Sequence, residues 1–191
     1  MTSRLAQGFY DHDPFDIARA LLGCLLCTNL DGRTAKGRIA ELEVYLGGHD
    51  KASHTYGFRR TARTEITFHG PNLAYIFGIY GKYFQFCITI GNAGAILVRA
   101  LEPVEGIELM ADRRRFSSVI PAKAGNLTDG PGRLCQALGI TRELYGEDLS
   151  GDRIWLEPSA ALPSGIETAK RIGIGYAEEY ADKPWRFIAK F

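Results

Sequence analysis

Residues 38–54 read RIAELEVYLGGHDKASH, and the first half of this stretch alternates between apolar and polar side chains. Successive side chains of an extended strand point to opposite faces. One face would carry Ala40, Leu42 and Val44, and the other would carry Ile39, Glu41, Glu43 and Tyr45. Such a strand packs its apolar face on the core. Its carboxylates fit either a solvated outer face or a catalytic group on a rigid element, and the alternation does not choose between them.

The composition around this stretch is that of an ordinary globular protein. The chain has 191 residues, of which 46% are hydrophobic and 24% charged. That length suits one sizeable core rather than two ordinary domains, so we expect a single domain over residues 1–191. The N-terminal residues MTSRLAQGFYDHD lack the apolar core of a signal peptide. We therefore expect a protein that is not secreted and works in the cytoplasm.

Charge and cysteine content narrow the possible partners. The cysteines at positions 24, 27, 87 and 135 are scattered, which favours reduced thiols over a disulfide framework. The chain holds 23 basic and 22 acidic residues, a net charge of +1. Any nucleic-acid contact must therefore rest on local clusters, such as Arg59-Arg60 with Arg63, rather than on bulk charge.

Turn and cap residues predict the remaining elements. Asp13-Pro14 predicts the start of a helix that ends at Gly23, and further helices are expected near 61–68, 102–115 and 132–138. Strands are expected at 24–30, 73–80, 83–90, 95–101, 152–158, 171–177 and 184–191. Residues 116–127 are weakly patterned, and we expect them to be mobile. The predicted fold class is α+β: a single domain with a mainly antiparallel curved β-sheet and several surrounding helices.

Arg99 is the single charge in the apolar strand 95–101, AILVRAL. A buried guanidinium costs several kcal/mol unless it is paired, so we expect Glu43 or Glu41 beside it. A carboxylate next to a guanidinium stays ionised and can hold and deprotonate a water molecule. Glu43, Arg99 and His54 could therefore form an active site, although a structural ion pair under a sheet fits the same residues.

Two other groups of residues carry alternative interpretations. His49, Asp50 and His54, with Glu41 or Glu43, include metal-ligating side-chain types and would suit a metal-dependent hydrolase, but the spacing lies in a glycine-rich loop and specifies little. Tyr80 abuts the turn at Gly81, near Arg59, Arg60, Arg63 and Lys82. A projecting aromatic flanked by cations suits a wedge between nucleic-acid bases, and an ordinary hairpin turn fits it equally well.

Taken together, the segments resemble the alkyladenine (3-methyladenine) DNA glycosylase family of the human type. The motifs that carry the resemblance are ARALLG at 18–23, GRIAELEVYLGGHDKASH at 37–54, IYGKYF at 79–84, VRALEPVEG at 98–106, GPGRLCQALGI at 130–140 and RIGIG at 171–175. They occur in the family's order over nearly the whole chain.

The resemblance implies an enzyme of base-excision repair that flips alkylated or deaminated purines out of double-stranded DNA. Glu43 would activate the attacking water, with Arg99 and a main-chain carbonyl near Ile172 completing the water site. Tyr80 would intercalate where the nucleotide leaves. The base pocket would comprise Tyr45, His54, Phe77, Cys87 and Leu97, and DNA-backbone contacts would come from Arg59, Thr61, Arg63 and Lys82.

The resemblance also implies a monomer that needs no cofactor or metal and that works in the nucleoid or the nucleus. No Lys falls at the water site, so we expect a monofunctional enzyme that leaves an abasic site. One position departs from the family's pattern: Cys87 stands where the family usually carries an Asn that excludes normal guanine. Purine selectivity is therefore open, and a non-catalytic binder of damaged DNA is the alternative function.

Overall fold

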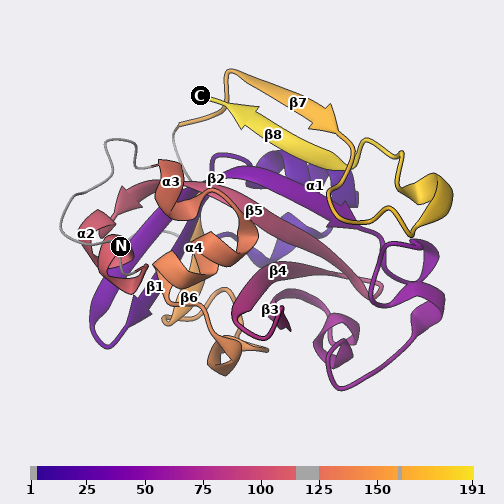
Figure 1. Ribbon diagram of the computed structural model, residues 1–191, viewed down its shortest axis with the longest axis horizontal. Coiled ribbons are helices and arrows are strands. Elements are labelled where there is room, and N and C mark those ends of the chain that lie inside the picture. The colour runs from indigo at the N-terminus through magenta and orange to yellow at the C-terminus, as the bar shows by residue number, and fades with distance from the viewer. Residues whose placement is uncertain (1–3, 115–124, 159–160) are drawn as a thin grey trace.

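The described strands pair into an 8-stranded sheet in a computed structural model of the chain, which describes residues 4–114, 125–158 and 161–191. The strands are β1 (Leu25–Leu30), β2 (Arg33–Tyr45), β3 (Pro71–Ile79), β4 (Tyr83–Gly91), β5 (Gly94–Glu105), β6 (Ile154–Glu157), β7 (Gly165–Ala169) and β8 (Arg186–Lys190). Their order is β3-β4-β5-β2-β1-β6, while β8 pairs with β2 and β7 with β8. All of these pairings are antiparallel, and the sheet twists and curves (Figure 1).

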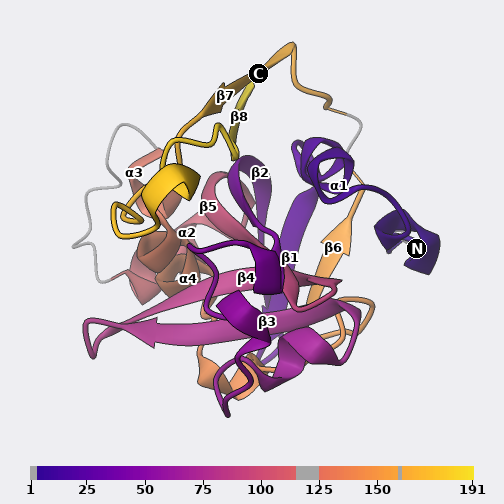
Figure 2. The same ribbon diagram turned by 90° about the vertical axis from the view of Figure 1, so that its right-hand side faces the viewer.

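The helices are α1 (Pro14–Leu21), α2 (Ile107–Arg113), α3 (Gly125–Thr128) and α4 (Pro131–Leu138). Short 3₁₀ turns are η1 (Gln7–Tyr10), η2 (Gly47–His49), η3 (Tyr56–Phe58), η4 (Glu65–Phe68), η5 (Arg142–Leu144) and η6 (Glu178–Tyr180). Figures 1 and 2 place α1 on the other side of β2 from α2, α3 and α4. The predicted α+β class is confirmed.

None of the helices in the described ranges is long and apolar enough to cross a membrane.

Helix α1 begins where its cap residues predict. The carboxylate of Asp13 accepts a hydrogen bond from the Phe15 amide at 2.8 Å, and Pro14 occupies the first helical position. The Asp13 carboxylate satisfies an amide that has no partner inside the helix, and Pro14 has no amide N–H that would need one. The buried face consists of Ile17, Ala18 and Leu21.

Strand β2 joins the two halves of the sheet because it pairs with β1, β5 and β8. Its register against β5 shifts on both sides of Glu41. As a result Ile39 and Leu42 both enter the main core, whereas Ala40 is only partly buried. The predicted placement of Ile39 with the carboxylates, and of Ala40 on the apolar face, was therefore wrong: a bulge at this point changes which residues share a face.

Alternate residues of β3, β4 and β5 belong to two different clusters. The main core takes Ala74, Ile76, Phe86, Ile88, Ile96 and Val98, together with side chains of α1, α2 and α4. The residues between them, Tyr75, Cys87, Ala95 and Leu97, form a second, smaller cluster with Ile66. The sheet therefore has a core side and a side on which a pocket can form.

Several predicted elements differ in the structure. Residues 171–177 form no strand, since burial there recurs every third residue, at Arg171, Ile174 and Ala177, and a turn bond links the Ala177 amide to the Ile174 carbonyl. The edge strand β7 was not predicted. Strand β5 runs to Glu105, so α2 starts later than expected, because residues 102–105 pair with β2. Most of the segment 116–127 lies outside the described residues, and α3 begins at Gly125.

The long loop after β2 rests on the turn between β4 and β5. The Thr55 hydroxyl donates to the Ala93 carbonyl at 2.8 Å. Gly47 has a φ of +72°, and a Cβ there would lie 2.4 Å from the Asn92 carbonyl oxygen. Only a residue without a side chain fits this contact.

Replacing Gly47 with Ala should therefore destabilise the fold more than the same change at Gly32, which has the same φ of +72° and no neighbour within 4 Å. Gly32→Ala should cost about 1 kcal/mol for the left-handed conformation. Gly47→Ala should cost about 1–3 kcal/mol more for the clash. Urea unfolding of both variants measures the difference, and equal losses would contradict this packing.

Candidate active site

Glu43 is a carboxylate with no exposed surface, held by donors from three parts of the chain. The Tyr45 hydroxyl donates to Oε2 at 2.8 Å, and the Ile172 amide donates to Oε1 at 2.8 Å. The guanidinium of Arg99 lies 3.3 Å from Oε1. Because a buried charge is tolerated only when it is paired and hydrogen-bonded, these contacts account for its burial.

Arg99 bridges the two carboxylates of β2, as predicted. Its Nε donates to Glu41 Oε1 at 2.8 Å, in addition to the contact with Glu43. Arg186 on β8 also donates to Glu41 Oε1, at 3.1 Å. The sequence offered Glu41 and Glu43 as equal partners, and the structure shows Arg99 contacting both.

Burial raises the pKa of Glu43 above its ordinary value of 4.5. The Arg99 charge and the hydrogen bonds from Ile172 and Tyr45 act in the opposite direction, and Glu41 adds to the rise. Desolvation of the carboxylate dominates. A carboxylate whose pKa is raised toward neutral pH is a stronger proton acceptor than an exposed one.

A row of cross-strand neighbours extends from Glu43 across three further strands. Glu43 pairs with Leu97, Leu97 with Cys87, and Cys87 with Tyr75. Cys87 and Tyr75 are 3% and 4% exposed. Burial also raises the pKa of the Cys87 thiol, so that it remains protonated and neutral. Leu97, Cys87 and Tyr75 form the floor of a cleft of about 970 Å³, and Glu43 lies below it.

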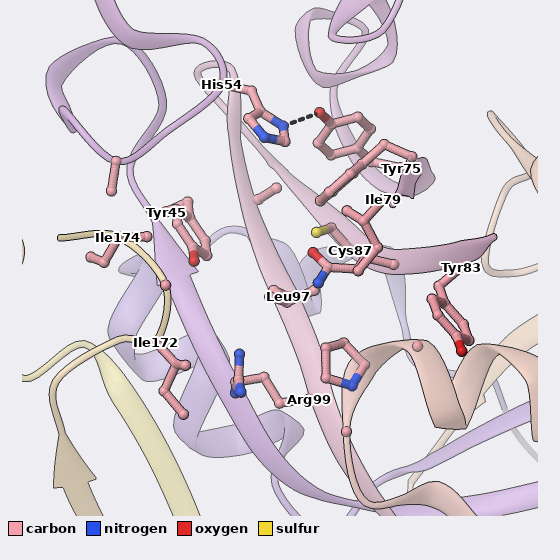
Figure 3. Close-up of a pocket in the computed structure, with 18 of the residues that line it drawn as sticks. Tyr45, His54, Tyr75, Ile79, Tyr83, Cys87, Leu97, Arg99, Ile172 and Ile174 are labelled. Atoms are coloured by element: carbon pink, nitrogen blue, oxygen red, sulfur yellow. Dashed lines mark hydrogen bonds between the residues drawn. The ribbon is translucent and has the colours of Figure 1, made fainter. Parts of the chain in front are cut away.

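The cleft brings together all five residues predicted for the base pocket, of which Figure 3 labels Tyr45, His54, Cys87 and Leu97. Its lining includes Tyr45, His54, Phe77, Cys87, Leu97, Arg99, Tyr80 and Ile172. Glu43 itself lies beneath this surface, in contact with Tyr45, Arg99 and Ile172, which do line it. The cleft is therefore lined by aromatic and aliphatic side chains together with polar ones such as Gln85, Asp129 and Arg133, with the Glu43 carboxylate directly beneath.

His54 stands at the rim of the cleft. Its Nδ1 and the Tyr75 hydroxyl share a hydrogen bond of 2.7 Å, and its ring meets Phe77 edge-on at 4.7 Å between centroids (Figure 3). Desolvation of the imidazole, with repulsion from Arg63, lowers the pKa of His54. The ring is therefore neutral at physiological pH and presents a flat, uncharged face.

Tyr80 projects from the turn between β3 and β4 and is 90% exposed. Its φ is +51°, a left-handed conformation that costs a non-glycine residue about 1–3 kcal/mol. Gly81, next in the turn, has a φ of +67°. The hairpin thus holds a large aromatic side chain in water at the edge of the cleft.

The basic residues predicted for DNA contacts lie outside the cleft lining. Arg59, Arg63 and Lys82 are exposed, and Thr61 exchanges hydrogen bonds with Thr64. Arg60 instead pairs with Glu65. The opposite wall, at the start of α4, adds Gly130, Pro131 and Arg133. The sequence predicts a helix at 132–138, but no local signal places its start in the cleft.

The three candidate metal ligands do not converge. His49 lies edge-on to Phe58, Asp50 is buried against Arg171, and His54 bonds to Tyr75. Within the described ranges, no group of three His, Cys, Asp or Glu side chains is placed to hold a metal ion.

Sequence reasoning missed several residues of the site. Tyr75 is buried in the smaller cluster, and its hydroxyl shares a hydrogen bond with His54 at the cleft. Gln85, Ile174 and Tyr176 also line the cleft. Alternation on β4 could have identified Gln85, two residues before Cys87. Nothing local marks Ile174 and Tyr176, which come from the irregular segment after Arg171. At Ile172 the structure shows an amide donor to Glu43, while the predicted water-site carbonyl stays a prediction.

Known proteins are similar to this chain over nearly its whole length. Residues 8–190 match the family model described as methylpurine-DNA glycosylase (MPG). A protein of Desulfitobacterium hafniense is 43% identical over 190 residues, covering 96% of this chain and 94% of its own. One of Bacillus cytotoxicus is 45% identical over 188 residues, covering 94% and 92%. Both carry the provisional name 3-methyladenine DNA glycosylase.

The buried carboxylate predicts an unusual stability effect. Because the pKa of Glu43 is raised in the folded state, its favourable contribution exists below the unfolded pKa and is lost as pH rises through the folded value. Glu43→Gln removes the titrating group, so the variant does not lose this stability as pH rises. The stability of the variant relative to wild type should therefore rise as pH increases from the ordinary carboxyl pKa of 4.5 through the folded-state pKa of Glu43. Thermal unfolding across this range measures the effect, and a difference that shrinks with rising pH would contradict it.

Proposed function

Because the chain belongs to the methylpurine-DNA glycosylase family, we propose that it removes damaged purines from duplex DNA by hydrolysing their N-glycosidic bond. The observation that carries this proposal is Glu43 beneath a cleft lined by aromatic rings. A flat base fits such a cleft, and a carboxylate under its floor can act on the bond between base and sugar.

The base must first leave the helix, because its glycosidic carbon is shielded inside the duplex. Tyr45, His54 and Phe77 supply rings that could stack on an extruded base. Tyr80 supports this step, since its exposed ring stands at the cleft edge and could occupy the vacated space. The strained backbone at Tyr80 suggests that the projecting position serves DNA binding.

Hydrolysis then needs a water molecule at the sugar. In the proposed step the water oxygen bonds to the glycosidic carbon, and the carbon–nitrogen bond breaks. The purine leaves with the electron pair, and the water proton passes to Glu43. The carboxylate also stabilises the oxocarbenium-like sugar. Arg99 orients Glu43 and balances its charge. Since Glu43 has no exposed surface in the free protein, DNA binding must admit the water.

The products of this step would be a free base and an abasic site. Cleavage of the strand by a lyase would need an amine in the site, and no Lys occurs among the cleft-lining residues in the part of the chain that the structure describes. We therefore propose a monofunctional glycosylase. Because one chain supplies the rings and the carboxylate together, it would act as a monomer, wherever the cell keeps its DNA.

Contacts with the DNA backbone are proposed for three exposed cations, Arg59, Arg63 and Lys82, and for the partly buried Thr61. Arg59, Thr61 and Arg63 follow His54 in the long loop, and Lys82 follows Tyr80 in the hairpin. Cations at these positions would hold phosphates on either side of the extruded nucleotide.

A non-catalytic binder of damaged DNA is the second candidate, favoured by the complete burial of Glu43 in the free protein. Such a protein would bind a lesion duplex tightly and release no base. Chromatography of the free base distinguishes the two functions directly.

Base release from a duplex with one alkylated or deaminated purine tests the proposal. Wild type should yield an abasic site that alkali cleaves at the lesion. Glu43→Gln keeps the size of the side chain but cannot accept the water proton, so release should fall by about 10²–10⁴-fold. The variant should still bind the lesion duplex, which serves as the folding control. Full release by Glu43→Gln would rule out this mechanism.

Cys87 leaves the floor of the cleft without an amide, and its side chain is small and neutral. We therefore expect lesions derived from guanine, with their additional amine, to be accepted. Cys87→Asn should lower the release of alkylated guanine relative to alkylated adenine by about tenfold, the scale of a steric discrimination in a pocket.

Cys87→Ser, which changes the size little and adds no amide, is the matched control for selectivity. An unchanged ratio of the two lesions in Cys87→Asn would show that this position does not select the purine.

A further inference from the structure

Asp50 and Arg171 form an ion pair whose two side chains have no exposed surface. The two terminal guanidinium nitrogens of Arg171 each donate a hydrogen bond to one carboxylate oxygen of Asp50, Nη1 to Oδ2 and Nη2 to Oδ1 at 2.9 Å. Asp50 also accepts from the amides of Leu46 at 3.2 Å and Ala52 at 2.9 Å. The loop after β2 is therefore tied to the segment that carries Arg171.

Arg171 makes further contacts with Val44 and Tyr45, the two residues after Glu43 on β2, and with Tyr180 and Trp185. Its Nη1 donates to the carbonyl of Val44 at 2.9 Å, and its Nη2 donates to that of Tyr180 at 3.3 Å. The guanidinium carbon lies 4.6 Å from the centroid of the Tyr45 ring and 4.9 Å from that of Trp185. Contacts of this kind between a guanidinium and an aromatic face are attractive, and strongest when desolvated.

The two residues adjacent to these contacts are two of the three donors that hold Glu43, and Arg99 is the third. Tyr45, under the guanidinium, donates its hydroxyl to Oε2, and Ile172, the next residue after Arg171, donates its amide to Oε1. Ile172 is 51% exposed and belongs to a segment without helix or strand, so sheet pairing does not place it. Arg171 is buried immediately before Ile172, and Ile174 and Ala177 are the other buried residues of that segment.

On the basis of the proposed function, we propose that Arg171 is a positioning residue for base release: through Tyr45 and Ile172 it holds the Glu43 carboxylate in its working geometry. Asp50, which the sequence offered as a metal ligand, is its fixed counter-ion. Neither side chain need touch the substrate.

An ion pair of this kind is weak evidence for stability, because the cost of burying two charges can exceed their attraction. Well-packed apolar residues often replace such pairs with no loss of stability. The planar guanidinium, however, supplies several donors in one fixed geometry, which neither Lys nor an apolar side chain reproduces. Geometry, rather than stability, is therefore the distinctive contribution of Arg171.

Variants at Arg171 separate positioning from folding. Arg171→Met removes the charge, and Arg171→Lys keeps the charge but loses the planar pair of guanidinium donors. Lys170→Met is the matched control, because Lys170 lies one residue away and pairs with Asp182 at the surface. The double variant Asp50→Leu with Arg171→Met removes both charges and leaves neither unpaired. Each is measured for unfolding free energy, for affinity toward a lesion duplex and for single-turnover base release.

Arg171→Met should slow single-turnover release by about 100-fold, the loss expected when a reacting group is misplaced by about 1 Å. Arg171→Lys should be impaired similarly, and Lys170→Met should match wild type. Affinity for the lesion duplex should change less than the rate. In the double variant stability should recover while release stays slow.

Two results overturn the proposal. The first is release that recovers together with stability in the double variant, which would make the pair purely structural. The second is a folded Arg171→Met that releases base at the wild-type rate. A wild-type protein that binds the lesion and releases no base would overturn the proposed function, and this inference would fail with it. That result is distinguishable from the two above, because in both of those the wild-type protein releases base.

Discussion

Complete burial of a carboxylate is the constraint on which this structure depends. Glu43 has no exposed surface, so it needs donors on every side, and they come from its own strand, from β5 and from residue 172 near the other end of the chain. The sheet topology meets this need. Strand β2 pairs with β5 along one edge and with β8 along part of the other, and β8 follows the segment that contains Ile172. The cleft then forms over Glu43 from the same face of β3, β4 and β5. The order of the strands therefore places the donors around Glu43 and the cleft above it.

Local signals were sufficient for much of the fold. Alternation identified the long strands, Asp13-Pro14 identified α1, and a lone Arg in an apolar strand required the acidic partners that it has. Features that depend on a partner strand were not predictable. The bulge near Glu41 arises from pairing with β5 and moves Ile39 into the core. Residues 171–177 alternate in sequence like a strand, but they pair with none of the described strands and instead turn around a buried Arg. The pairing of Asp50 with Arg171, far apart in the chain, leaves no local signal, so Asp50 resembled a metal ligand.

The candidate site concentrates features that do not favour stability. A desolvated carboxylate, a buried ion pair and a tyrosine in the left-handed conformation each have a cost that the surrounding core must offset. Proteins commonly hold such features where they act on a ligand. Here Tyr80 lines the cleft, Glu43 lies beneath it, and the ion pair contacts Tyr45 of its lining through Arg171.

The account rests on Glu43 accepting a proton from water. The most direct test is the pH dependence of kcat/KM for release of an alkylated purine that is already cationic and needs no proton to leave. The acid limb of kcat/KM reports the free enzyme. The account predicts a single acid limb whose pKa lies above 4.5 and coincides with the Glu43 pKa measured by carboxyl NMR. A rate that stays constant as Glu43 becomes protonated would contradict it.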